Sequence, residues 1–120
     1  MGFQMIRKND ETIVLSNGVL ARDFYTRLRG LIGRTELNRG EGMLFPKCNS
    51  VHMWMMKIPI DVIFLTRNGE EWKIAALHPS VKPWKFLPIA CMKASDTLEL
   101  SSGAIEELGL EKGQTLCIVS

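Results

Sequence analysis

Short apolar runs separated by turn residues recur along most of the chain, and this pattern predicts β-strands. Two short apolar runs, Thr12–Leu15 and Gly18–Ala21, stand on either side of Asn17-Gly18. Asn-Gly is a preferred sequence for a two-residue hairpin turn, because both residues tolerate a positive φ angle. We therefore expect the chain to open with a β-hairpin over residues 12–21.

The middle of the chain predicts strands that are covered on both faces. Val51–Met56 and Ile60–Leu65 are apolar at nearly every position, so neither face of these strands suits contact with water. A second Asn-Gly turn separates them from Glu71–His78, whose alternation predicts a strand with one face in water. The proline-rich stretch from Pro79 to Pro88 then predicts an ordered loop packed by its own aromatic residues.

The last part of the chain predicts two short strands around a short helix. The strands cover residues 97–100 and 115–119. Between them, Ser102 can cap a helix that runs through Leu108, and Gly109 or Gly113 can end it.

One earlier segment has a helical period instead. Phe24, Leu28 and Leu31 recur at spacings of three and four residues, which places them on one side of a helix. This spacing predicts the main helix of the protein, from about Asp23 to Arg34.

These patterns together predict an α+β fold that is mostly β. We expect a small antiparallel sandwich or a partly closed barrel, with the main helix near the N-terminus and a short second helix. A length of 120 residues is typical of one domain, and no linker divides the chain. Residues 1–120 are therefore expected to form a single domain.

Charge and cysteine content narrow the function classes. The formal net charge is only +2, and the arginines between residues 22 and 39 are interrupted by acidic residues, so we expect no nucleic-acid partner. No run of about 18 apolar residues is present, so we expect no membrane association. The three cysteines at 48, 91 and 117 are widely spaced, and no signal peptide precedes the first charges. Reduced thiols and a cytoplasmic location are the expectation.

Four residues could in principle assemble a zinc site: Cys48, His52, His78 and Cys91. Their spacing argues against it, because structural zinc sites usually contain a tight pair such as Cys-x2-Cys. A Cys48 nucleophile activated by His52 is also disfavoured, since residues four apart on a strand lie about 13 Å from each other. We expect no metal and no cofactor.

Several blocks of the sequence form a recognisable pattern when read in order. The most specific are Gly42-Met-Leu-Phe45 and Pro59-Ile-Asp-Val-Ile-Phe64, followed by Leu98-Glu-Leu100 and Gly113. In these blocks the chain resembles the DUF192 family, a group of small prokaryotic proteins of unknown function. The resemblance implies a compact β-rich α+β fold with one main helix near its start, and it implies no reaction. Gln114 stands where relatives commonly have Asp, which argues against a carboxylate role in that turn.

Asp61 is the most informative polar residue, because it lies between apolar neighbours on a strand predicted to be covered on both faces. A buried carboxylate needs either backbone N–H donors or a positive partner, and Arg34 at the end of the predicted helix is our first choice of partner. We expect a cleft lined by five ligand-binding residues, namely Arg34, His52, Trp54, Asp61 and Trp84.

Two functions fit such a cleft. The first is a non-enzymatic binding domain for a small ligand or a protein segment. The second is an enzyme that uses Asp61 or His52 in acid/base catalysis.

Overall fold

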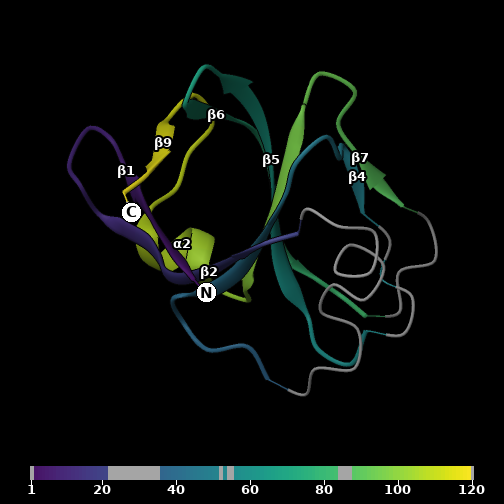
Figure 1. The fold of residues 1–120 in the computed structure, drawn as a ribbon. Coiled ribbons are helices and arrows are strands. Elements are labelled where there is room, and N and C mark those ends of the chain that lie inside the picture. The colour runs from purple at the N-terminus through teal and green to yellow at the C-terminus, as the bar shows by residue number, and fades with distance from the viewer. Residues whose placement is uncertain (1, 22–35, 52, 54–55, 84–87, 120) are drawn as a thin grey trace.

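Seven strands close into a β-barrel in the computed structural model, which describes residues 2–21, 36–51, 53, 56–83 and 88–119. The barrel strands are β1 (Phe3–Arg7), β2 (Ile13–Leu20), β3 (Glu41–Phe45), β5 (Ile60–Asn68), β6 (Glu71–Val81), β8 (Asp96–Ser101) and β9 (Thr115–Ile118). Their order around the barrel is β1-β2-β3-β8-β5-β6-β9, and β9 pairs with β1 to close the ring (Figure 1). All these pairs are antiparallel except β2 with β3, which is parallel.

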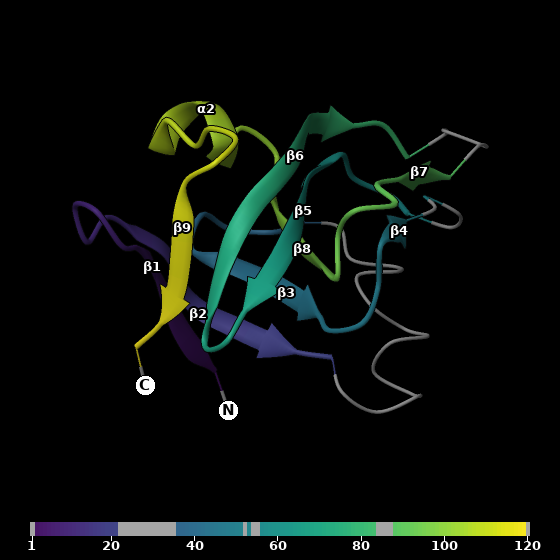
Figure 2. The ribbon, with the colours of Figure 1, turned by 90° about the horizontal axis from the view of Figure 1, so that it is seen from above.

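Two smaller elements complete the described structure. β4 (Ser50–Val51) pairs with β7 (Ile89–Ala90) in a two-stranded sheet that lies beside the barrel (Figure 1). The helix α2 (Ala104–Leu108) lies across one end of the barrel, and the two chain termini lie toward the other end (Figure 2).

The central strands separate two hydrophobic cores. Inside the barrel, Ile63 and Leu65 of β5 pack with Leu98 of β8 and with residues of α2. On the outside of the same strands, Val62 and Phe64 belong to a second core that includes residues near β4 and β7. Side chains alternate between the two faces of a strand, so β5 supplies both cores. The prediction that this strand is covered on both sides is confirmed.

The end of the barrel under α2, which we call the closed end, is held by polar side chains from distant strands. Asp61 accepts hydrogen bonds from the backbone N–H groups of Gly103 (3.2 Å) and Ile105 (2.8 Å) at the start of α2. At the other terminus of this helix, Arg7 donates to the carbonyl oxygens of Leu108 (2.8 Å) and Gly109 (3.1 Å). Backbone groups that a short helix leaves unpaired are thereby satisfied at both termini.

The first hairpin differs from the expected one. It joins β1 to β2, and Asn17-Gly18 lies inside β2, which continues from Ile13 to Leu20. The N–H groups of Ser16 and Asn17 both donate to the carbonyl of Gly40, so a neighbouring loop satisfies the backbone where a turn was expected. Gly18 is also required for packing, since a Cβ atom there would come within 2.6 Å of the Phe3 ring.

The other predicted elements have mixed outcomes. A mostly β fold is confirmed, and the barrel is closed rather than partly closed or a sandwich. The hairpin at Asn68-Gly69 and the strands β5, β8 and β9 are confirmed. The predicted main helix from about Asp23 to Arg34 lies outside the described residues, so α2 is the one helix the structure describes.

Three local expectations need correction. The strand expected over 51–56 lies partly outside the described residues; its described part is β4 (Ser50–Val51), while Met53 and Met56 are in no strand. β6 runs on to Val81 and takes in the start of the expected proline loop. Ser102 makes no cap, because Gly103 occupies the N-cap position and Asp61 supplies the acceptor oxygens there. Within the described ranges, no helix has the length and apolar character needed to cross a membrane.

Candidate functional site

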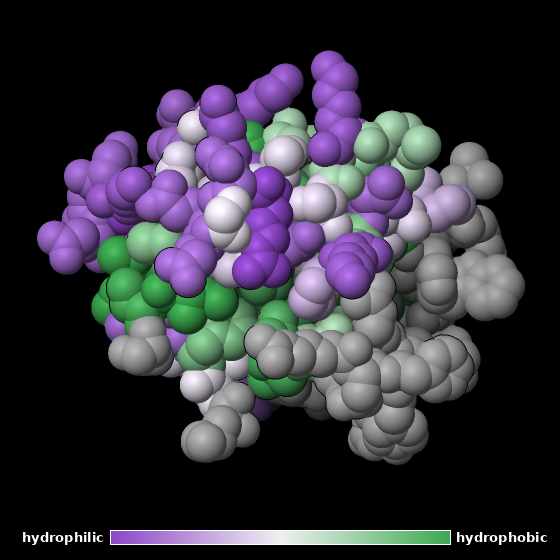
Figure 3. Space-filling model, turned by 45° about the horizontal axis from the view of Figure 1, so that its top comes forward, coloured by the Kyte–Doolittle hydropathy of each residue, from purple (hydrophilic) through white to green (hydrophobic). Residues whose placement is uncertain are grey.

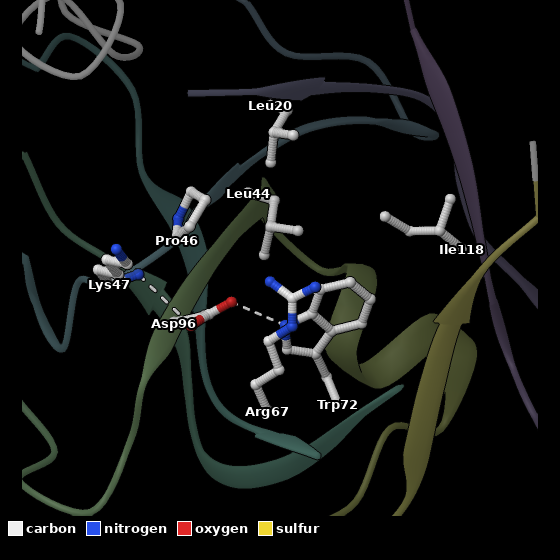
Figure 4. A pocket seen from close by; sticks show the side chains of 8 residues that line it. All are labelled: Leu20, Leu44, Pro46, Lys47, Arg67, Trp72, Asp96 and Ile118. Atoms are coloured by element: carbon white, nitrogen blue, oxygen red, sulfur yellow. Dashed lines mark hydrogen bonds between the residues drawn. The ribbon is translucent and has the colours of Figure 1, made fainter. Parts of the chain in front are cut away.

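The end of the barrel opposite α2 is hollowed, and we call this hollow the mouth pocket (Figure 4). It has a volume of about 380 Å³. Its lining comes from β2, β3, β5, β6, β8, β9 and the turn after β3, and consists of Leu20, Leu44, Pro46, Lys47, Arg67, Trp72, Asp96 and Ile118. Strands far apart in the sequence therefore meet here at one end of the ring.

Trp72 and Asp96 form the buried polar contact of the mouth pocket. The indole Nε1–H of Trp72 donates to Oδ2 of Asp96 at 2.7 Å, and the backbone N–H of Lys47 approaches Oδ1 at 3.4 Å (Figure 4). Asp96 is only 3% exposed, so its carboxylate needs these donors. The contact fixes the indole plane, which forms one wall of the pocket.

Arg67 places a positive charge against that wall. Its guanidinium carbon lies 5.2 Å from the centre of the Trp72 ring, which is within the range of a cation–π contact (Figure 4). Nε of Arg67 donates to the carbonyl of Gly69 at 3.0 Å, and its backbone N–H donates to Ser95 Oγ at 2.8 Å. Within the described part of the chain, its two terminal nitrogens have no hydrogen-bond partner.

The remaining lining is mainly aliphatic. Leu44 is fully buried, whereas Leu20 is half-buried and Ile118 is exposed at the rim. Val19, next to Leu20, is also exposed. The surface view in Figure 3 shows a hydrophobic area beside a largely hydrophilic one. Lys47 adds a second exposed cation from the turn after β3, where its φ of 55° is left-handed. The site thus combines an apolar body with two cations.

A third acidic residue, Glu99, is buried away from both ends of the barrel. It lies between Met43 and Val62 in the strand register, on the outer face of β8, and is 8% exposed. Burial raises the pKa of its carboxyl group to about 7, because water no longer solvates the charged form. The sequence pattern contained this residue within Leu98-Glu-Leu100 but gave no sign of its burial.

The structure describes one of the five predicted ligand-binding residues. Asp61 is 0% exposed, and it accepts a third hydrogen bond from the backbone N–H of Ser80 at 2.8 Å. Its geometry matches a structural carboxylate that accepts backbone N–H groups and has no surface open to a ligand. Arg34, His52, Trp54 and Trp84 lie outside the described residues, and so does the proposed pair of Arg34 with Asp61.

The other candidates of the sequence form no common site among the described residues. Cys48 and Cys91 lie near each other, because the backbone N–H of Cys91 donates to the carbonyl oxygen of Asn49 at 3.0 Å and both cysteines pack against the outer core. Cys48, Cys91 and Cys117 are free thiols. His78 packs edge-on against Phe64, with ring centroids 5.5 Å apart. Among the described residues, no three metal-ligating side chains gather in one place.

Sequence reasoning missed the residues of the mouth pocket. The strand that contains Trp72 was expected, but Trp72, Arg67 and Asp96 were given no role. The available signal was Asp96, an acidic residue two positions before the buried Leu98 and therefore on the same, inward face of the strand. That signal is visible only once the inward face of β8 is known.

The fold and this site define a small closed β-barrel whose open end contains a pocket with apolar walls and two cations. The family model of DUF192, described as "Uncharacterized ACR", matches residues 5–118, and the chain belongs to this family. No match is found among curated proteins.

Two crystal structures are similar to this chain. One is a protein of unknown function from Novosphingobium aromaticivorans DSM 12444, with a TM-score of 0.78 and 23% identity over 97% of this chain and 83% of the other. The second is described as a candidate transcription regulator from Sinorhizobium meliloti 1021, with a TM-score of 0.77 and 27% identity over 97% of this chain and 91% of the other. The first likeness shows the fold alone.

Proposed function

We propose that this domain is a non-enzymatic binding domain that takes up a small ligand in the mouth pocket. The observation that carries the proposal is a hollow of about 380 Å³ at the open end of the barrel. This volume lies within the range of small-molecule sites, which combine apolar walls with a few convergent polar groups. The indole of Trp72 and the side chain of Leu44 supply the walls, and Arg67 and Lys47 supply the polar groups.

The position of the pocket also supports binding. Asp61 and α2 close the opposite end of the barrel, and a hydrophobic core fills the interior beneath the pocket. Pockets in the mouths of β-barrels recur among binding proteins because strand ends bring side chains from many strands together. The cleft predicted near Arg34, His52, Trp54 and Trp84 remains a separate proposal for a second contact region.

Native mass spectrometry of freshly purified protein tests this function. A copurified small molecule is expected on the wild-type chain. Leu20→Trp should fill the pocket and lose this molecule. Ile13→Trp is the matched control, because Ile13 is exposed and lies outside the pocket lining on the same strand β2. Equal retention of the molecule by both variants would show that it binds elsewhere.

The alternative function is an enzyme that uses Asp61 or His52 in acid/base catalysis. Asp61 is fully buried and accepts three backbone N–H groups, which leaves it no access to a substrate, and His52 lies outside the described residues. Incubation of the copurified molecule with fresh protein separates the two functions. Unchanged recovery supports binding, whereas conversion that disappears in His52→Gln supports the enzyme.

The proposal includes the partners and the location. The Sinorhizobium protein is described as a candidate transcription regulator, which suggests DNA as a partner for that protein. For this chain we propose no nucleic-acid partner, because a net charge of +2 is too small to neutralise many phosphates. Fluorescence anisotropy with a mixed-sequence duplex at low salt is expected to show no binding. A cytoplasmic location is supported by the three free thiols.

A further inference from the structure

The acidic and basic side chains around the mouth pocket differ in their exposure to solvent. Asp96 is the acidic residue of its lining, and both carboxylate oxygens face donors from Trp72 and Lys47. Its charge is therefore used within the protein and is almost completely buried. The two basic side chains, Arg67 and Lys47, are exposed. A ligand that enters meets positive groups at the rim before it meets the bound carboxylate.

The geometry of Arg67 specifies the kind of negative group. Trp72 holds the guanidinium from one face, and Gly69 binds Nε, which leaves the two terminal nitrogens without a described partner. A guanidinium edge with free N–H groups matches the two oxygens of a carboxylate in a bidentate contact. The stacking on Trp72 fixes the plane of this group before a ligand arrives, which reduces the entropy lost on binding.

The walls specify the rest of the ligand. Leu20 and Ile118 present partly exposed aliphatic side chains, and the almost fully buried side chains of Leu44 and Trp72 complete the apolar lining. Burial of an apolar chain against these groups is favourable at about 25 cal/mol per Å² of area removed from water. A fully charged or strongly hydrated ligand would leave these walls unused.

We propose that the mouth pocket selects small organic monocarboxylates, with the carboxylate at Arg67 and Lys47 and the apolar body against Trp72, Leu44 and Leu20. This inference rests on the proposed binding function and adds the chemical class of the ligand. A cationic amphiphile is the competing class, because it could displace Arg67 from the ring of Trp72 and form its own cation–π contact.

Three probes of equal chain length test the selection: hexanoate, hexan-1-ol and hexylammonium. Each is titrated into the purified protein, and binding is followed by the NMR signal of the Trp72 indole N–H, assigned with the Trp72→Phe variant. We expect hexanoate to bind about tenfold more tightly than hexan-1-ol, since a hydrogen bond to a charged group contributes about 1.5 kcal/mol or more. Hexylammonium should bind more weakly than hexan-1-ol.

A pair of variants assigns the preference to the pocket. Arg67→Gln should remove most of the tenfold preference for hexanoate, and the Trp72 indole N–H signal of the unliganded variant reports whether the pocket is intact. Lys73→Gln is the matched control, because it removes an exposed cation from β6 next to Trp72 without touching the pocket lining. This control should keep the full preference.

The outcomes separate the two levels of the proposal. Equal affinity for hexanoate and hexan-1-ol would overturn the carboxylate selection and leave the binding function standing. Tighter binding of hexylammonium would overturn the selection in favour of the cationic class. A preference that survives Arg67→Gln would also overturn it. Absence of binding by all three probes, together with absence of a copurified molecule, would overturn the binding function itself.

Discussion

The two ends of the barrel each contain an inward-facing aspartate, and the two are held in different ways. At the closed end, Asp61 accepts three backbone N–H groups, from Ser80, Gly103 and Ile105. At the open end, Asp96 accepts one short hydrogen bond from the Trp72 side chain and one long approach from the backbone of Lys47. Backbone donors fasten a helix onto the barrel, whereas a side-chain donor shapes the wall of a pocket. The same residue type thus fastens a helix at one end and shapes the mouth pocket at the other.

The largest expected effect is at the closed end. Both carboxylate oxygens of Asp61 accept backbone N–H groups, and Asp61→Asn replaces one of these oxygens with an NH2 donor. At least one buried backbone N–H then loses its acceptor. We expect a loss of about 4 kcal/mol in the free energy of unfolding. Urea denaturation followed by circular dichroism measures it. Glu71→Gln, at an exposed pair with Lys8, is the control and should leave the free energy of unfolding nearly unchanged.

The next largest effect is the pH dependence of stability caused by Glu99, which lies at neither end of the barrel. Its pKa is about 7 in the folded protein and 4.5 as an ordinary glutamate, so the folded state holds a proton that the unfolded chain has released between these values. The free energy of unfolding should therefore fall as the pH rises from 4.5 to 7, by about 3 kcal/mol in all.

Glu99→Gln should remove this dependence, since glutamine is neutral at every pH. Chemical denaturation between pH 4.5 and pH 8 measures the change, with Glu70→Gln in the exposed turn as the control. A wild-type stability that is flat or rises with pH across this window would show that the carboxyl group is solvated or paired with a cation.

A smaller effect is expected at the open end. Asp96→Asn can keep its oxygen toward Trp72 Nε1 and turn its NH2 group toward the distant Lys47 N–H. We expect a loss of about 1 kcal/mol, the difference between a charged and a neutral acceptor. The same denaturation experiment compares it with Asp61→Asn. Equal losses at the two positions would contradict the difference between the closed end, where Asp61 holds a helix, and the open end, where Asp96 shapes a pocket.

The smallest effect concerns Arg67. Its contact with Trp72 is exposed, and such cation–π contacts contribute about 0.5 to 1 kcal/mol. Arg67→Gln should therefore lower the free energy of unfolding by no more than about 1 kcal/mol. A loss of several kcal/mol would mean that this arginine supports the fold, and the binding comparison would then require a milder change such as Arg67→Lys.

The strands were predictable where the pattern was local. β5, its turn at Asn68-Gly69, β8 and β9 follow from alternation and turn residues within a few positions. The burial of Asp61 also followed, because its neighbours on the strand are apolar. The closure of the barrel could not be predicted from the sequence, since no local pattern in β1 or β9 indicates that the two strands pair with each other.

The polar contacts were harder to predict because their partners are distant in the sequence. Asp61 caps a helix that begins more than 40 residues later, so the local search chose Ser102 instead. Trp72 and Asp96 meet across 24 residues of sequence, and Arg67 reaches the same place from another strand. Such sites depend on the register of several strands, which a single sequence does not state.

The pairing of β1 with β9 has a consequence for how the protein is made. A ribosome synthesises β1 before the other strands and β9 after them, so the ring cannot close until both are outside the ribosome. Until then β1 and β6 each lack the neighbour that β9 provides, and their edges are open to pairing with other chains. The nascent chain is therefore most exposed to aggregation in the interval before its last strand emerges.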